Sequence, residues 1–325
     1  MKKYDNYDAN LNDEATAFDS QIMQPINGGH IPDLDNTQNC DFFYNNPWRR
    51  KYFADLDFGE QCDLIVYSIE KHLGKKTEAI KILEVGCGPG YVSLALARKG
   101  YLVTGLELSS DCIDVAKATA EKYSPGLIGS NLDYVCDDFF SFSERNLNVF
   151  NVVLFIGAMH HFPDQGRINL SSKKVLKPNG LLICHEPVRD LVTKKNAILN
   201  HLITTLLSVS GSYFKNLKEG YEVCIEADVE RIFNELRYEL EDGEKVQSVN
   251  VNEAGYHEMY PTLLKHFTEL EFQWRYGVFH EIIGGIRLGK ESEEAALAKF
   301  IRDIDKVMCS EKIVDPTEVF FVGKK

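Results

Sequence analysis

The sequence lacks the long apolar run that a membrane-spanning helix requires. The longest candidate, residues 197–209, is shorter than the roughly 20 residues needed and is interrupted by Asn200 and His201. The first eight residues, Met-Lys-Lys-Tyr-Asp-Asn-Tyr-Asp, contain no apolar segment of the kind found in signal peptides. We therefore expect a cytoplasmic location and no association with a membrane.

Positive charge is scarce as well. The chain has 36 Lys and Arg against 49 Asp and Glu, which gives a net charge of −13. Binding to phosphate backbones needs clustered basic side chains, and the short basic group at residues 49–51 does not change the balance. We expect no nucleic-acid partner.

Paired cysteines are absent. The eight cysteines are scattered along the chain, and none of them forms a C-x-x-C pair. This pattern is typical of reduced thiols in a cytosolic protein, and it argues against a zinc site.

A glycine-rich turn is the most informative feature present. The apolar segment 82–85 runs into three glycines at alternate positions, Gly86, Gly88 and Gly90. A segment with apolar residues at helical spacing, 92–96, follows and stops at a glycine. The pattern predicts a buried strand, a tight turn and a helix, which open a βαβ unit able to admit a nucleotide-like ligand.

The spacing of these glycines separates two kinds of nucleotide. A dinucleotide-binding turn has the spacing G-x-G-x-x-G and seats a pyrophosphate on the helix N-terminus. Here the third glycine comes one position early, and Glu84 stands two residues before the first. A carboxylate beside the turn suits a cationic ligand better than a pyrophosphate. Glu107 closes the next apolar run, where a carboxylate can accept both hydroxyls of a ribose.

The Glu-x-Gly-x-Gly-x-Gly pattern of residues 84–90 closely resembles motif I of class I S-adenosylmethionine-dependent methyltransferases. The resemblance covers about residues 80–187 and the last strands. It implies S-adenosylmethionine as cofactor, S-adenosylhomocysteine as product, and no metal, because the magnesium site of catechol-type methyltransferases has no counterpart here. The residues that it places around the cofactor are Glu84 at the amine; Gly86, Cys87 and Gly88 under the methionine part; Glu107 at the ribose; Leu108, Asp137, Asp138 and Phe139 on the adenine side; and Gly157 and Ala158 along the backbone. For Asp137 and Asp138 a solvated helix start is the alternative.

Residues 155–164 form a second motif, at the carboxyl end of the fourth expected strand. They are similar to the Leu-His-His-hydrophobic-Pro-Asp segment of many small-molecule methyltransferases. We take His160 as the candidate base for the acceptor proton and His161 as structural or catalytic. The alternative is that neither histidine is catalytic, because positioning alone supplies much of the rate of methyl transfer.

The next strand ends with His185 and Glu186 at the same sheet edge. Glu186 either orients a histidine, binds a substrate amine or anchors the following segment. His185 is a candidate substrate contact, together with Tyr44 and Trp48 near the N-terminus, although aromatic residues there are more often plain packing. Six later residues are unranked candidates: His257, Tyr260, Trp274, Tyr276, His280 and Glu281.

Alternating strand and helix patterns predict an α/β fold with a doubly wound, mostly parallel seven-stranded sheet. The expected strands are 81–85, 101–107, 132–136, 149–156, 181–184, 270–276 and 318–323, and the resemblance implies that the last one is antiparallel. The expected organisation is a flexible acidic arm (1–40), an N-terminal helical lid (41–78), the cofactor-binding core (79–187), an inserted helical cap (188–252) and the C-terminal part of the sheet (253–325). The inserted helices form either a cap over the pocket or a homodimer interface.

These observations favour transfer of a methyl group to an oxygen or nitrogen of a small molecule, a metabolite or natural-product intermediate. A peptide or protein methyltransferase is one alternative. A non-catalytic protein that binds the cofactor as a regulator or partner subunit is another.

Overall fold

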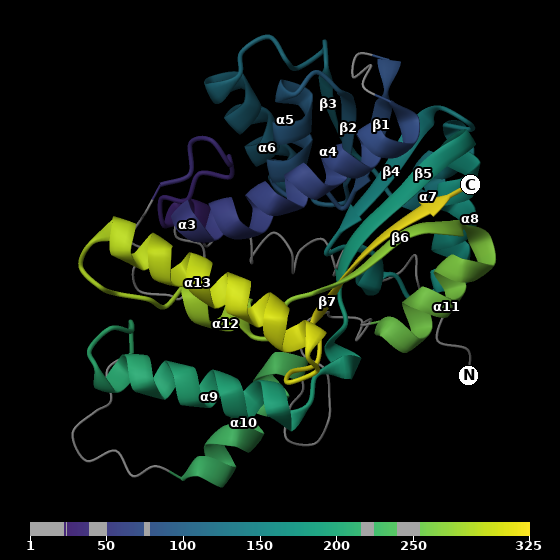
Figure 1. The fold of residues 1–325 in the computed structure, drawn as a ribbon. Coiled ribbons are helices and arrows are strands. Elements are labelled where there is room, and N and C mark those ends of the chain that lie inside the picture. Colours follow the sequence, from purple (N-terminus) through teal and green to yellow (C-terminus); the bar gives the residue numbers. More distant parts are fainter. Residues whose placement is uncertain (1–22, 24, 39–50, 75–78, 216–223, 239–253) are drawn as a thin grey trace.

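The computed structural model describes residues 23, 25–38, 51–74, 79–215, 224–238 and 254–325 (Figure 1). Its centre is one seven-stranded sheet with the order β3-β2-β1-β4-β5-β7-β6. The strands are β1 (Lys81–Val85), β2 (Leu102–Glu107), β3 (Leu132–Cys136), β4 (Phe150–Ile156), β5 (Leu176–Pro187), β6 (Thr268–Arg275) and β7 (Glu318–Lys324). This arrangement confirms the predicted doubly wound α/β fold.

The last strand is the antiparallel one. β1 to β5 pair in parallel, whereas β7 lies between β5 and β6 and runs antiparallel to both. The start of β7 therefore lies beside the carboxyl end of β5, with Glu318 opposite Pro187. The topology brings a residue from the C-terminal region of the chain to the sheet edge where ligands bind in open α/β folds.

Both faces of the sheet are buried. Along β4, Val152 and Leu154 belong to one apolar cluster, and Val153 and Phe155 belong to the other. Helices α4 (Glu60–Leu73), α5 (Tyr91–Arg98) and α6 (Ser110–Tyr123) cover the first face. Helices α7 (Phe139–Arg145), α8 (Gln165–Val175) and α11 (Tyr256–His266) cover the second (Figure 1). A strand covered on both sides is apolar throughout, which explains why the sequence pattern of β4 was continuous.

A third group of helices lies below the carboxyl ends of the strands (Figure 1). It contains α9 (Lys194–Val209), α10 (Ile225–Arg237), α12 (Phe279–Ile283) and α13 (Glu291–Ser310). A separate apolar cluster, centred on Phe279, Ile282 and Ile283, joins α12 to partly buried side chains of α9 and α13. A short helix α3 (Lys51–Ala54) and a wider helical turn η1 (Asp55–Gly59) lead into α4. Within the described ranges, no helix combines the length and apolarity needed to cross a membrane.

All strands except β5 lie within two residues of their predicted limits. β5 begins at Leu176 rather than at 181, because Leu176 already pairs with Phe150 before the strand bulges and resumes at Leu181. The bulge contains a turn in which Asn179 has a φ of 61°. Helix α10 ends at Arg237, and Tyr238 terminates it in the left-handed region.

Candidate functional site

The turn after β1 is closed on one side and open on the other. The amides of Gly86 and Cys87 donate to the carbonyl of Leu106 at 2.8 and 3.1 Å, which holds the turn against β2. A Cβ added at Gly86 would lie 2.7 Å from the Cβ of Ala158, so this glycine allows the turn to contact the loop after β4. At Gly88, whose φ is +51°, a Cβ would meet no atom within 4 Å. A ligand can therefore approach the backbone at Gly88.

Glu107 fixes the edge of this open side. Its carboxylate accepts the amides of Gly88 at 3.0 Å, Leu108 at 2.7 Å and Ser109 at 3.1 Å. The carboxylate thus lies next to Gly88, and the half-buried Leu108 follows it directly. This geometry fits a ribose beside the turn, as the resemblance implies.

Glu84 lies beneath the turn rather than on its open side. Its side chain is 3% exposed and accepts a hydrogen bond from the hydroxyl of Ser93. Burial raises the pKa of this carboxyl to about 7, although the Ser93 hydroxyl acts in the opposite direction. A contact between Glu84 and the amine of a cofactor stays a prediction. Cys87, next to it in space, is also buried, and burial raises the pKa of its thiol well above the usual range.

The acidic pair after β3 divides into two roles. Asp138 is the N-cap of α7, since its carboxylate accepts the amide of Ser141 at 2.8 Å. Asp137 is ion-paired with Arg145 and partly exposed, and its contact with an adenine stays a prediction. The side chain of Phe139 is buried in the core, and its ring centroid lies 5.8 Å from that of Phe155. Phe139 can therefore line a cofactor site only through its backbone.

The ends of β4 and β5 are tied together by Glu186. This buried carboxylate accepts the amides of Ala158 at 3.1 Å and Met159 at 2.9 Å, and it lies 2.7 Å from Nδ1 of His160. Burial raises the pKa of Glu186, and the backbone donors oppose that rise. The ring of His161 lies against that of His160, with centroids 4.0 Å apart. Glu186 consequently orients His160 and anchors the loop that carries it.

Gly157 begins the same loop. Its amide donates to the carbonyl of His185 at 2.9 Å, and its φ is +61°. As at Gly88, a Cβ at this position would meet no atom within 4 Å. Gly88, Glu107 and Gly157 thus stand at or just after the carboxyl ends of β1, β2 and β4, which are neighbouring strands in the sheet. Contact of these residues with a cofactor stays a prediction.

A cavity of about 360 Å³, hereafter the strand-end pocket, lies at the carboxyl ends of β4 and β5. Gly157 and His160 line it from the β4 side, and Leu236 and Tyr238 line it from α10 and its C-terminal end. The other lining residues are Asp57, Phe58, Gln61, Ile156, His185, Glu186, Pro187, Arg189, Gly277, Val278, His280, Glu281, Thr317 and Glu318.

Five lining residues form one continuous polar chain. Nε2 of Gln61 lies 2.5 Å from Nδ1 of His185, and Nε2 of His185 lies 2.7 Å from Glu318. The other oxygen of Glu318 lies 2.8 Å from Nδ1 of His280, whose Nε2 lies 3.0 Å from Asp57. This chain joins α4, β5, β7, α12 and η1 around the pocket.

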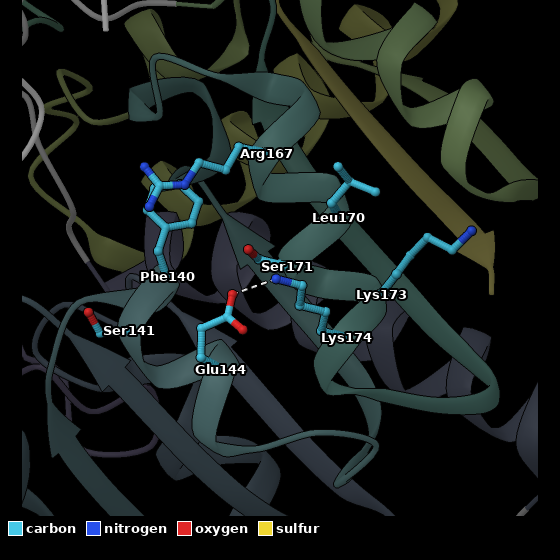
Figure 2. A pocket seen from close by; sticks show the side chains of 8 residues that line it. All are labelled: Phe140, Ser141, Glu144, Arg167, Leu170, Ser171, Lys173 and Lys174. Carbon is cyan, nitrogen blue, oxygen red and sulfur yellow. Dashed lines mark hydrogen bonds and ion pairs between the residues drawn. The ribbon is translucent and has the colours of Figure 1, made fainter. Parts of the chain in front are cut away.

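A second hollow, of about 520 Å³, lies between α7 and α8 and shares no lining residue with the strand-end pocket (Figure 2). Two of its basic groups, Lys174 and Arg167, already have partners within the chain. Lys174 is ion-paired with Glu144 at 2.5 Å, and the guanidinium of Arg167 lies 3.8 Å from the centre of the Phe140 ring (Figure 2). None of the expected site residues lines it.

Sequence reasoning did not identify Asp57, Gln61 and Glu318. They belong to no local motif, and only the antiparallel insertion of β7 and the packing of η1 and α4 bring them to the strand ends. Of the six unranked late candidates, His280 and Glu281 line the strand-end pocket. The other four, His257, Tyr260, Trp274 and Tyr276, do not line it. Tyr44 and Trp48 lie outside the described residues.

The described part of the chain contains no group of three or more His, Cys, Asp or Glu side chains arranged to hold a metal ion. Its seven cysteines are all free thiols.

Comparison with known proteins identifies the central part of the chain. The methyltransferase domain family matches residues 83–184. The ubiquinone biosynthesis O-methyltransferase of Coxiella burnetii is 35% identical over 101 residues, which is 31% of this chain and 41% of the relative. The same enzyme of Vibrio atlanticus is 31% identical over 109 residues, 33% of this chain and 44% of the relative. The chain thus matches less than half the length of these curated relatives.

Two solved structures share the fold over nearly the whole chain. The [4+2]-cyclase SpnF aligns with a TM-score of 0.52 and 15% identity, over 96% of this chain and 95% of the cyclase. A candidate sarcosine dimethylglycine methyltransferase from Galdieria sulphuraria aligns with a TM-score of 0.51 and 12% identity, over 94% and 98% of the two chains. At such identities these likenesses establish the fold alone.

Proposed function

We propose that this chain transfers a methyl group to an oxygen or nitrogen of a small molecule, because its residues 83–184 match the methyltransferase domain family. S-adenosylmethionine is the cofactor, and S-adenosylhomocysteine is the product. When bound, the cofactor supplies an electrophilic methyl group on its sulfonium.

One observation carries the proposal. The loop after β4 contacts the glycine turn, where a Cβ on Gly86 would meet Ala158, and it also lines the strand-end pocket through Gly157. A methyl donor at the glycine turn and an acceptor in the pocket would meet at this loop. A cavity of about 360 Å³ suits a small molecule.

His160 has the position and the orientation of a base. Its Nδ1 hydrogen is directed to Glu186 at 2.7 Å, which places the basic lone pair of the neutral ring on Nε2. In the proposed reaction His160 takes the proton that the acceptor oxygen or nitrogen loses as it attacks. Glu186 acts through His160 as a positioning residue, and His161 packs against the ring.

The inserted segment is proposed to be a cap over the pocket, since Leu236 and Tyr238 line the cavity from α10. A homodimer through the same segment is also proposed, supported by exposed apolar side chains along α9: Ile198, Leu202 and Leu206. A cytoplasmic location likewise stays a proposal.

The test is to incubate the purified chain with methyl-labelled S-adenosylmethionine and separate small-molecule and peptide fractions of an extract. We expect label in the small-molecule fraction and an equal amount of S-adenosylhomocysteine. His160→Gln should lower kcat by about 100-fold or more, the usual contribution of a general base, and leave the affinity for S-adenosylhomocysteine nearly unchanged. Label confined to peptides would favour a peptide or protein methyltransferase. Tight cofactor binding without any turnover would favour a non-catalytic binding protein.

A further inference from the structure

The described walls of the strand-end pocket carry an excess of negative groups. Four carboxylates line it, Asp57, Glu186, Glu281 and Glu318, against one guanidinium, that of Arg189. The other titratable side chains that line it are three histidines, His160, His185 and His280, and the phenol of Tyr238. The contacts of each group decide what the pocket offers to a ligand.

His280 is held as a cation between two carboxylates. Both of its nitrogens face acceptors, Glu318 at 2.8 Å and Asp57 at 3.0 Å, so both must carry hydrogens. Burial lowers the pKa of His280, but the two carboxylates together raise it well above the usual range. For Glu318, burial raises the pKa, and the contacts with His280 and His185 outweigh it and lower the pKa. The carboxylates of Asp57 and Glu318 therefore already have histidine partners.

His185 fixes the orientation of Gln61. In a neutral His185 ring whose Nε2 hydrogen faces Glu318 at 2.7 Å, Nδ1 carries no hydrogen and accepts one. The amide nitrogen of Gln61 therefore faces the ring, at 2.5 Å, and the amide oxygen points away from it. That oxygen is buried, in a residue 6% exposed, and has no hydrogen-bond partner within the described structure. An unsatisfied buried acceptor costs roughly 1–3 kcal/mol, which a donor on a ligand would recover.

Glu281 is the one carboxylate of the four without a hydrogen bond or ion pair among the described residues. Glu186 is bound by backbone amides and His160, and the other two by the histidines. Burial raises the pKa of Glu281, and nearby His280 and Arg189 oppose that rise. The guanidinium of Arg189 itself lies 3.9 Å from the centre of the Tyr238 ring.

We propose that the acceptor is a small molecule bearing a protonated amine, which Glu281 binds through its charge while the amide oxygen of Gln61 accepts a hydrogen bond from the same molecule. This inference rests on the proposed function and names the substrate class of that site. Among the described residues, the carboxylate of Glu281 and the amide oxygen of Gln61 have no hydrogen-bond partner, and both are acceptors, so they select a ligand that supplies donors. A ligand carboxylate would face Glu281 across the pocket and be repelled. The amine anchors the molecule, and the methylated atom is the one that the anchor brings to His160.

Three probes that share a phenol ring test the proposed substrate class: tyramine, which ends in an ammonium group; 4-propylphenol, which ends in a methyl group; and 3-(4-hydroxyphenyl)propanoate, which ends in a carboxylate. Their affinities for the full chain are measured by ligand-detected NMR, with and without S-adenosylhomocysteine. We expect tyramine to bind at least about tenfold more tightly than the neutral probe, the size of one charge-assisted hydrogen bond. Glu281→Gln should abolish this preference, Glu281→Asp should retain part of it, and Glu311→Gln, a change at an exposed carboxylate outside the pocket, should leave it intact.

Equal or tighter binding of the neutral or anionic probe would overturn the inference, as would a preference that survives in Glu281→Gln or an absence of tyramine binding at millimolar concentration. Thermal denaturation confirms that each variant is folded. Calorimetry with S-adenosylhomocysteine on the same samples tests the cofactor separately. Loss of cofactor binding would refute the proposed function, whereas loss of the amine preference alone would refute only the substrate class.

Discussion

The three glycines of the turn after β1 all have positive φ, yet their surroundings differ. A Cβ at Gly90 would lie 2.4 Å from the hydroxyl oxygen of Tyr134, whereas one at Gly88 would enter open space. We expect Gly90→Ala to lower the free energy of unfolding by about 2–4 kcal/mol, through left-handed strain and overpacking. Gly88→Ala should lower the free energy of unfolding only through the left-handed strain, by about 1 kcal/mol. Its affinity for S-adenosylhomocysteine should fall by about tenfold or more, because the added methyl group occupies ligand space.

Urea denaturation and calorimetric titration of the two variants check this pair. A Gly88→Ala variant that binds S-adenosylhomocysteine like the unmodified chain would show that the cofactor does not approach this face of the turn.

Glu84 makes the stability of the protein depend on pH. Its folded pKa of about 7 lies above the ordinary value of 4.5, because the carboxyl is buried. Between these two values the unfolded chain releases the proton while the folded chain keeps it. The stabilisation from Glu84 is therefore complete below pH 4.5 and is lost as the pH rises to about 7. The expected loss is about 3 kcal/mol.

Glu84→Gln, which resembles the protonated form, isolates this effect. As the pH rises from 4.5 to about 7, the free energy of unfolding of the unmodified chain should fall relative to that of the variant. A difference that stays constant over the window would mean that Glu84 ionises normally in the folded protein.

At the residue level, the sequence predicts those parts of the candidate site that form contiguous motifs. The glycine turn, Glu107 and the histidine loop each belong to a short segment at the end of a strand. Gln61 and Glu318 have no such signal, since 257 positions separate them and β7 alone brings Glu318 beside His185. The division of labour between Asp137 and Asp138 also needed the structure, because either residue can cap a helix.

At the level of elements, helix α6 offers a matched pair of serines. Either serine at the start of this helix has the side chain of a cap, and the structure assigns the cap to Ser109, whose hydroxyl accepts the amide of Cys112 at 3.0 Å. We expect Ser109→Ala to lower the free energy of unfolding by about 1 kcal/mol. Ser110→Ala, at an exposed position in the first turn, should change it by less than about 0.5 kcal/mol. Chemical denaturation that ranks the two variants equally or in reverse would contradict the assignment.

The strands were the most predictable elements. The limits of β1 and β3 agree with the sequence prediction, because glycine or polar residues bound short apolar runs there. The early start of β5 was missed, since its first residue pairs with β4 before a turn that looked like a loop. Apolar periodicity also could not show which helices would line the pocket. α9 and α10 have similar patterns, but only α10 and its C-terminal residue contribute lining side chains among those described.

At the level of the whole molecule, the exposed apolar side chains of α9 lead to a prediction about assembly. If α9 joins two copies, the double variant Leu202→Glu and Leu206→Glu should sediment as a monomer at concentrations where the unmodified chain is a dimer. The same substitutions on α13, at Phe300 and Val307, serve as a control on another exposed apolar face. An unmodified chain that sediments as a monomer would refute the dimer and favour the cap alone.

The fold as a whole does not decide the reaction, since a [4+2]-cyclase and a candidate methyltransferase resemble this chain almost equally well. The claim of methyl transfer depends instead on a cofactor bound between Gly88, Glu107 and Gly157. The most direct test is calorimetric titration of the purified chain with S-adenosylhomocysteine, alongside Glu107→Ala and with NAD as a comparison ligand. We expect micromolar binding of S-adenosylhomocysteine, at least about tenfold weaker binding in the variant, and none of NAD. Equal binding in the variant, or binding of NAD alone, would contradict the account.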